Sequence, residues 1–332
     1  PAGTSPSVRL ELTATDGAAV KYKLDNGAVL PATSSAQAEI PVTGSTPVHT
    51  LEVWTVMGAI TSPSVTVHIK VADAVSTYSQ LKNVVQHTPE NGTEQYKYNY
   101  STPLNIHIGS GLTASANTEI AITGGKKLKL SSLPAGNVHT VNANNSGRIF
   151  KVSWPGTELT LEDIKLTDGN TADGIGGAVH VETGGKLVLK GKTVIPPSTG
   201  GDENTPGKND VYLASGASIK VDGALAAAEP IVARITPNYT DGNTVLTGSP
   251  ASVSTNYTKF SVTQPDDGFL WTIKSDGTLK AIPTIINSGS GAWQRLKEAV
   301  QVLPEGSTRN LFFVCLPLLE PHFARLNHAL RR

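Results

Sequence analysis

One short motif constrains the fold of this chain more than any other feature: a glycine, two residues of any kind, and two apolar residues separated by one position. The motif occurs four times, as GKKLKL from Gly125, GTELTL from Gly156, GGKLVL from Gly184 and GASIKV from Gly216. The intervals between these glycines are 31, 28 and 32 residues. Short alternating segments that return at such a period are typical of a solenoid, in which each unit buries its apolar side chains against its neighbours.

A second alternating apolar pair stands eight or nine residues before each of these pairs. Because alternate residues of a strand lie on one face, both pairs predict strands with one apolar side. Strands of successive units would pair in parallel, about 4.8 Å apart, around one core. The predicted columns of stacked side chains are Ile120/Phe150/Val179/Val211, Ile122/Val152/Val181/Leu213, Leu128/Leu159/Leu187/Ile219 and Leu130/Leu161/Leu189/Val221. The pattern therefore predicts a parallel β-helix.

The composition agrees with an all-β chain that is rich in turns. Charged residues make up 16% of the 332 residues, below the roughly 25% of an average soluble protein. The 27 basic and 27 acidic residues cancel, so the chain has no general attraction to nucleic acid or to an anionic membrane. No apolar run approaches the roughly 18 residues of a membrane-spanning helix. The single cysteine, Cys315, excludes an intramolecular disulfide.

Residues 1–73 are expected to form a separate module. They alternate in short runs such as VRLELTA and HTLEVWTV between turns rich in Gly, Pro and Ser, which predicts a small antiparallel sandwich. The segment DGAAVKYKLDNG, followed by LEVWTVMGAITSPSVTVHI, resembles the small Ig-like modules of bacterial surface proteins and glycosidases, among them the C-terminal module of chitobiases. The resemblance implies an Ig-like β-sandwich.

A capping helix is predicted at about 76–88, at the start of the β-helix domain of residues 74–290. Ser76 or Thr77 can cap its N-terminus, and it would cover the open core and unpaired edges at the first end of the shaft. Residues 223–290 are expected to supply further strands or a closing hairpin near the other end. The helix segment STYSQLKNVVQHTPENG returns 215 residues later as GAWQRLKEAVQVLPEGST, so residues 291–308 are expected to begin a second copy.

The last segment, residues 309–332, does not follow the repeat. It holds Cys315 and half of the six phenylalanines, and the Thr- and Gly-rich style ends at Thr308. Two interpretations stay open: a tail that is not native to the protein, or an amphipathic cap whose apolar face would suit a membrane surface.

The middle of the chain resembles a known group. The stretch RIFKV…LTLEDIKLTDGNTADGIGGAVHVETGGKLVLKG is similar to the repeat-bearing β-helix proteins of bacterial surfaces, which are related to the polymorphic outer-membrane proteins. Their GGA-apolar tetrapeptide is present at Gly176–Val179, whereas their Phe-x-x-Asn motif is absent. The resemblance covers about residues 76–250, and it implies a secreted or surface location, an adhesive or structural role and no shared catalytic residues.

One outward column has charges that could form a site. Directly after the second strand of each unit stand Ser131, Glu162, Lys190 and Asp222. Acid, base and acid on successive coils would form an ion-pair ladder. The alternative is a catalytic or binding triad, as in β-helices that bind or cleave acidic polysaccharides.

Three other features have residue types that occur in binding sites. Asp168–Gly174, the turn DGNTADG, holds two acids but departs from the EF-hand loop, so it is expected to be a solvated turn rather than a calcium site. His180 is expected to point outward with no second metal ligand nearby in sequence. Tyr96, Tyr98 and Tyr100 share one strand face and could stack on sugars or pack on a neighbouring element.

The sequence as a whole predicts an all-β protein: a right-handed parallel β-helix preceded by an Ig-like sandwich. The expected role is a non-enzymatic, secreted or cell-surface bacterial shaft, associated with the outer membrane, that binds a host matrix protein, a glycan or a like copy. The alternative is a polysaccharide lyase or glycoside hydrolase that uses the outer groove. No cofactor, metal or nucleic acid is expected to bind. Contact with a membrane is expected only through an anchor outside this sequence or through the tail.

Overall fold

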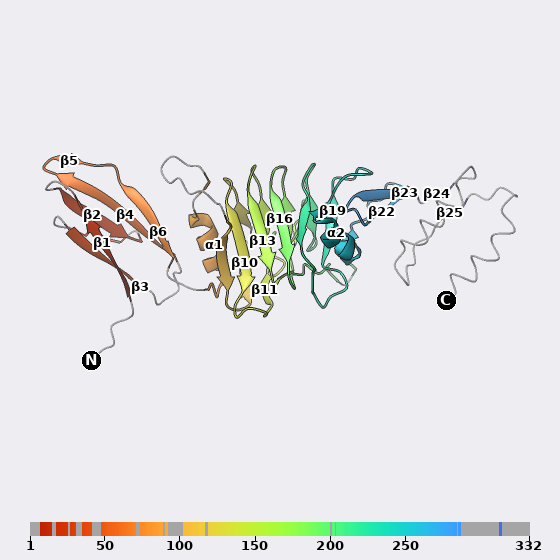
Figure 1. The fold of residues 1–332 in the computed structure, drawn as a ribbon, viewed down its shortest axis with the longest axis horizontal. Coiled ribbons are helices and arrows are strands. Elements are labelled where there is room, and N and C mark those ends of the chain that lie inside the picture. The colour runs from red at the N-terminus through yellow and green to blue at the C-terminus, as the bar shows by residue number, and fades with distance from the viewer. Residues whose placement is uncertain are drawn as a thin grey trace.

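The structure is a computed structural model that describes residues 7–14, 18–25, 27–30, 35–41, 48–70, 74–88, 90–91, 102–116, 119–199, 201–202, 204–283, 285–286 and 312–313. Its central part is a parallel β-solenoid, in which strands of successive coils lie side by side (Figure 1). Two sheets of six strands and one sheet of three strands run along this solenoid. The predicted parallel β-helix is therefore confirmed.

The strands of the first three coils pass from sheet I to sheet III to sheet II, and those of the later coils alternate between sheets I and II. Sheet I consists of β7 (Leu104–Ile108), β10 (Lys127–Ser132), β13 (Glu158–Glu162), β16 (Lys186–Lys190), β18 (Ile219–Asp222) and β20 (Leu246–Gly248). Sheet II consists of β9 (Ile120–Ile122), β12 (Phe150–Val152), β15 (Val179–Val181), β17 (Val211–Leu213), β19 (Ala233–Pro237) and β21 (Phe260–Val262). Sheet III consists of β8 (Leu112–Thr113), β11 (His139–Asn142) and β14 (Ile164–Thr167).

The predicted columns form the core of the solenoid. Phe150 pairs with Ile120 on one side and Val179 on the other, and Leu159 pairs in the same way with Leu128 and Leu187. Every side chain of the four predicted columns is at most 1% exposed. Since each coil alone holds only two or three short strands, this stacking is what removes its apolar side chains from water.

The motif glycines lie in the turns that lead from a sheet II strand to the next sheet I strand. Their φ angles are 69° at Gly125, 81° at Gly156, 86° at Gly184 and 75° at Gly216. A side chain at such a left-handed position is strained, which explains why a glycine stands there in each repeat.

The predicted capping helix is also confirmed. Helix α1 (Tyr78–His87) begins after Thr77, whose side chain accepts a hydrogen bond from the Gln80 N–H, while the Gln80 side chain accepts one from the Thr77 N–H. Tyr78, Leu81, Val84 and Val85 are buried in the same apolar cluster as the columns. Lys126 donates from Nζ to the Val85 carbonyl over 3.1 Å, so the first coil caps the far end of the helix.

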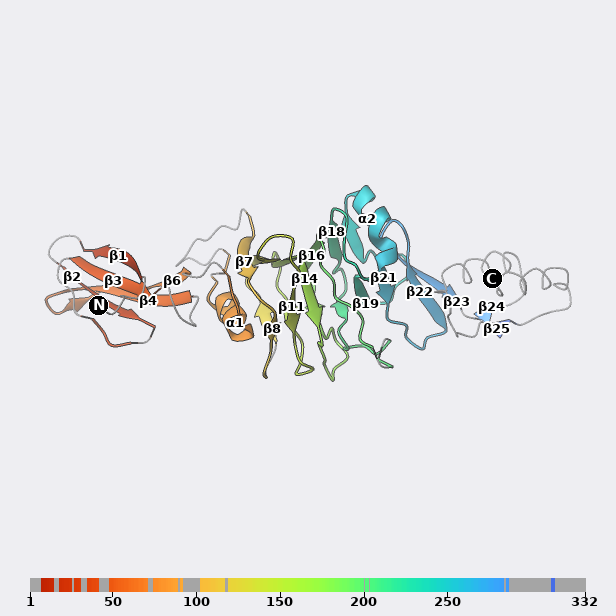
Figure 2. The same ribbon diagram turned by 90° about the horizontal axis from the view of Figure 1, so that it is seen from below.

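A short helix and a hairpin lie at the other end of the solenoid, as Figure 2 shows. Helix α2 (Pro250–Asn256) follows β20, and strands β22 (Phe269–Ile273) and β23 (Leu279–Pro283) pair antiparallel. Trp271, Ile273 and Leu279 of this hairpin join the common core. The expected closing hairpin is therefore present, and α2 is an addition that the alternating pattern did not predict.

The N-terminal strands pair antiparallel, as expected for residues 1–73. Strand β1 (Ser7–Thr13) pairs with β3 (Ser35–Pro41), and β4 (Val48–Met57) pairs with β2 (Ala19–Leu24), β5 (Ile60–Thr61) and β6 (Val65–Lys70). Their assignment to an Ig-like sandwich stays a prediction.

The C-terminal segments are described only in small part. Strands β24 (Ile285–Ile286) and β25 (Phe312–Phe313) pair in parallel. The second helix copy at 291–308 lies outside the described residues, as does the remainder of the tail. Within the part that the structure describes, no helix has the length and apolar character to cross a membrane.

Candidate functional site

The predicted ladder of charges is present at the end of the sheet I strands. Lys190 on β16 lies between Glu162 on β13 and Asp222 on β18 in the register of the sheet. The Lys190 Nζ is 3.5 Å from Glu162 Oε1 and 3.9 Å from Asp222 Oδ2. Lys129, on β10 one coil before Glu162, also pairs with Glu162. We call Lys129, Glu162, Lys190 and Asp222 the charge ladder; Ser131, the first residue of the predicted column, instead bonds to His107.

The electrostatics of the charge ladder favour the ionised form of Glu162. A hydrogen bond from Lys129 is the main reason why the pKa of the Glu162 carboxyl lies below its ordinary value, and the charge of Lys190 adds to it. A general acid needs a raised pKa, so that it holds a proton near neutral pH. Among the described residues, the carboxyl groups with a displaced pKa are all displaced downward: Glu52, Glu162, Asp173, Glu182, Glu229 and Asp276.

A second polar cluster lies on the side of sheet II and is centred on Arg148, which the sequence patterns did not single out. Its guanidinium pairs with Glu119 and, over 3.0 Å, with Asp173 Oδ2. It also donates to the carbonyl oxygens of Ile175 and Gly176 over 2.6 Å and 3.0 Å. Arg148 is only 8% exposed. The signal that could have found it is a cation just before an apolar strand, a position that becomes buried when the next coil is added.

The Asp168–Gly174 turn uses its two acids within the protein. Asp168 Oδ2 accepts a hydrogen bond from the Asn142 amide over 2.6 Å, and Asp173 binds Arg148. Burial opposes the shift in the pKa of Asp173, but hydrogen bonds from the Ile175 N–H, Thr171 and Arg148 outweigh it and lower the pKa. The two carboxylates are therefore directed to different partners, which supports the interpretation as a connecting turn.

His180 and Tyr212 lie side by side on the outer face of sheet II. They are paired in the register of β15 and β17, and their rings meet edge to face with centroids 5.1 Å apart. Burial lowers the pKa of His180, and the nearby charge of Arg148 lowers it further, so the neutral imidazole is favoured. One coil earlier, Lys151 Nζ pairs with Glu182 Oε1 over 2.8 Å. This face therefore combines two rings with paired charges.

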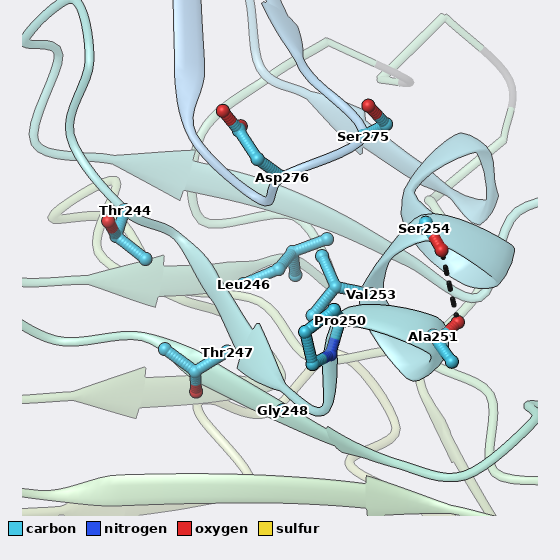
Figure 3. Close-up of a pocket in the computed structure, with 10 residues that line it drawn as sticks. All are labelled: Thr244, Leu246, Thr247, Gly248, Pro250, Ala251, Val253, Ser254, Ser275 and Asp276. Atoms are coloured by element: carbon cyan, nitrogen blue, oxygen red, sulfur yellow. Dashed lines mark hydrogen bonds between the residues drawn. The ribbon is translucent and has the colours of Figure 1, made fainter.

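A cavity of about 600 Å³ lies at the C-terminal end of the solenoid, between β20, α2 and the turn of the β22–β23 hairpin (Figure 3). Leu246 and Val253 form its apolar floor, and Asp276 is the one carboxylate among the described residues that line it. Hydrogen bonds from the Thr278 hydroxyl and N–H lower the pKa of Asp276 to about 2. Asp276 therefore acts as the acceptor of its own turn and is not available as a proton donor.

The other predicted site residues give no convergent set. Tyr96, Tyr98 and Tyr100 lie outside the described residues. Across the described ranges, no three His, Cys, Asp or Glu side chains come together in a group that could hold a metal ion. The described residues thus form a set of ion pairs and one aromatic face on the outside of the solenoid.

Comparison with known proteins gives no relative: no family model, no curated protein and no solved structure matches this chain.

Proposed function

We propose that this protein is a non-enzymatic shaft, secreted or held at a bacterial cell surface, that binds a matrix protein, a glycan or a like copy through its outer faces. The observation that supports this proposal best is the charge ladder. Its two cations and two carboxylates pair with one another across four successive coils instead of converging on a cleft. Charges that are paired in this way stiffen a surface but leave no free acid and base for hydrolysis.

The architecture supports the same role. One apolar cluster extends from α1 through the stacked columns to the β22–β23 hairpin. Each coil contacts its neighbours along two or three sheets, so the solenoid resists bending and presents its turns at regular intervals. A rigid rod with regularly spaced outer faces suits the display of a binding surface away from a cell. The relation to the polymorphic outer-membrane proteins is part of this proposal.

The experiment that tests the proposal measures binding and turnover on the same preparation. The full chain is applied to immobilised matrix proteins and to a glycan array, and it is incubated with a panel of acidic and neutral polysaccharides. We expect saturable binding to at least one of these ligands and no release of reducing ends or unsaturated sugars. Turnover of a polysaccharide would instead favour the alternative, a lyase or glycoside hydrolase that uses the outer groove.

The proposed location requires its own measurement. An antibody against the β-helix domain, applied to intact cells of the source bacterium, should label their surface or detect the protein in the medium. Labelling only after the cells are lysed would contradict the location.

A further inference from the structure

We infer that the outer face of sheet II around Trp154, His180 and Tyr212 is a binding site for a neutral glycan of two or more sugar units. This inference rests on the proposed function, because it names the ligand class and the surface for a binding shaft. Three independent observations support it: the conformation of Trp154, the unpartnered polar groups of the two rings, and the charge balance around them.

Trp154 stands in a conformation that a large side chain rarely adopts. Its φ angle is 84°, and its side chain is 65% exposed in the turn between β12 and β13. The register shows that this turn is one residue longer than its successor, since Val152 pairs with Val181 and Glu158 pairs with Lys186. An exposed tryptophan at a left-handed position gains nothing from packing that would offset its strain, and such outliers gather at functional sites.

The turn that holds Trp154 contacts the next coil. The Cα atom of Pro155 lies 3.1 Å from the point where a Cβ on Gly184 would be. Gly184 follows β15, the strand of His180, so the turn that holds Trp154 lies beside the end of that strand. The register then continues from Lys151 to His180 and Tyr212 on successive coils, about 4.8 Å apart. The face is therefore elongated along the solenoid axis, as the binding site of an oligosaccharide is.

The two rings have polar groups without partners. Neither the His180 ring nor the Tyr212 hydroxyl makes a hydrogen bond to any described residue, and His180 Nδ1 is buried without a partner. Because His180 Nδ1 is covered by the protein, the polar group that can bond to a ligand on this face is the Tyr212 hydroxyl, which has no partner among the described residues. Aromatic rings supply both an apolar face for sugar C–H groups and a polar edge for hydroxyls.

The charges around the rings favour a neutral ligand over an acidic one. The cations Arg148 and Lys151 are paired with three carboxylates: Glu119, Asp173 and Glu182. His180 is held in its neutral form by burial and by the charge of Arg148. Because the local cations are outnumbered, a uronic acid or sulfated sugar would meet net repulsion, whereas hydroxyl groups can use the paired charges as donors and acceptors.

The test compares variants of the full chain on an array of neutral and acidic oligosaccharides. Trp154→Gly removes the indole and keeps the left-handed turn, and Tyr212→Leu removes the second ring. Phe269→Leu is the matched control, because Phe269 is also an exposed aromatic, 40% exposed, but belongs to the hairpin β22. Circular dichroism and thermal unfolding establish that all three variants are folded.

We expect wild type and Phe269→Leu to bind the same neutral oligosaccharide, and each of the other variants to bind it about three- to tenfold more weakly, the effect of one aromatic contact. Unchanged binding in Trp154→Gly and Tyr212→Leu, or binding of acidic sugars only, overturns the inference. Binding of a matrix protein alone, equal in all variants, also overturns it but leaves the proposed function standing. Turnover of a polysaccharide without any stable binding overturns both.

Discussion

At the scale of single residues, the glycines of this chain meet two different requirements. Gly216 has a φ angle of 75° and nothing near the place of a Cβ, so conformation alone demands it. Gly177, in the GGA motif, is limited by space: a Cβ there would lie 2.2 Å from the Gly207 carbonyl oxygen and 2.6 Å from that of Gly169. The motif that suggested a surface-protein family therefore has a local structural cause, the close approach of three backbone segments.

These two requirements predict different costs for the same substitution. Gly216→Ala should lower the free energy of unfolding by about 1–2 kcal/mol, the strain of a left-handed residue. Gly177→Ala should lower it by about 3 kcal/mol, because both obstacles are backbone atoms that cannot turn aside. Urea unfolding of both variants measures the difference. An equal or smaller loss in Gly177→Ala would show that the three segments can separate at little cost.

The charge ladder predicts small effects from its own residues. Glu162→Gln and Lys190→Met should each change the free energy of unfolding by no more than about 1 kcal/mol, since partly exposed ion pairs are screened by water. Lys151→Met, which breaks the ion pair with Glu182 on sheet II, is the matched control and should behave alike. Thermal unfolding checks the stability of all three. A variant of the charge ladder that alone abolishes a turnover reaction would contradict the structural role.

At the scale of elements, helix α1 covers the first end of the solenoid. Four of its residues, Tyr78, Leu81, Val84 and Val85, are buried over the open end of the first coil. Lys126 from that coil bonds to the last carbonyls of the helix, and burial lowers the pKa of its ammonium group. Helix and first coil thus stabilise each other, because each satisfies groups that the other would leave unpaired.

The burial pattern of α1 predicts that two substitutions in this helix change the free energy of unfolding by very different amounts. Leu81→Ala should lower the free energy of unfolding by about 2–5 kcal/mol, because Leu81 is fully buried and its loss leaves a cavity. Gln86→Ala, at an exposed position of the same helix, should change it by less than about 0.5 kcal/mol. Urea unfolding with light scattering measures both stability and association. Equal stability of the two variants would mean that α1 does not close the core.

At the scale of the whole molecule, the ion pairs make the shaft sensitive to acid. Hydrogen bonds from Lys129, Lys151 and Lys165 are the largest causes of the lowered pKa of Glu162, Glu182 and Glu229. A carboxyl with a lowered pKa binds fewer protons in the folded chain than in the unfolded chain. It therefore contributes stability above its unfolded pKa of 4.5, and this contribution is lost as the pH falls through the folded value.

The expected outcome is a thermal midpoint that falls steadily on acidification. His180 adds to the same direction, since burial lowers its pKa and the folded state disfavours its charged form below about pH 6.5. The loss should begin below that pH, steepen below 4.5 and continue toward 2, the pKa of Asp276. Thermal unfolding at pH 7, 5 and 3 measures it. A midpoint that rises between pH 7 and pH 3 would contradict the sign of these shifts.

The limits of the sequence pattern can be seen at the ends of the solenoid. In the later coils, Pro237 stands opposite Leu213 and Gly248 stands opposite Val221. The alternating apolar pattern is therefore no longer visible in the sequence, although the strands continue. The strands of sheet III have two to four residues, too few for alternation to mark them. Register over the middle coils was sufficient to predict that Glu162, Lys190 and Asp222 stand side by side, but not that Lys129 joins them.

The coil can be read from the chain alone: period-two alternation sets which side chains turn inward, and glycine sets where the backbone can take a left-handed turn. Both depend only on near neighbours in the chain. Three features required the folded structure: Arg148 is enclosed by the next coil, Lys129 reaches Glu162, and Trp154 lies exposed with a φ angle of 84°. Those contacts join different coils, and the lengths of the intervening turns set them; a side chain therefore acquires its partner only after stacking has fixed the register.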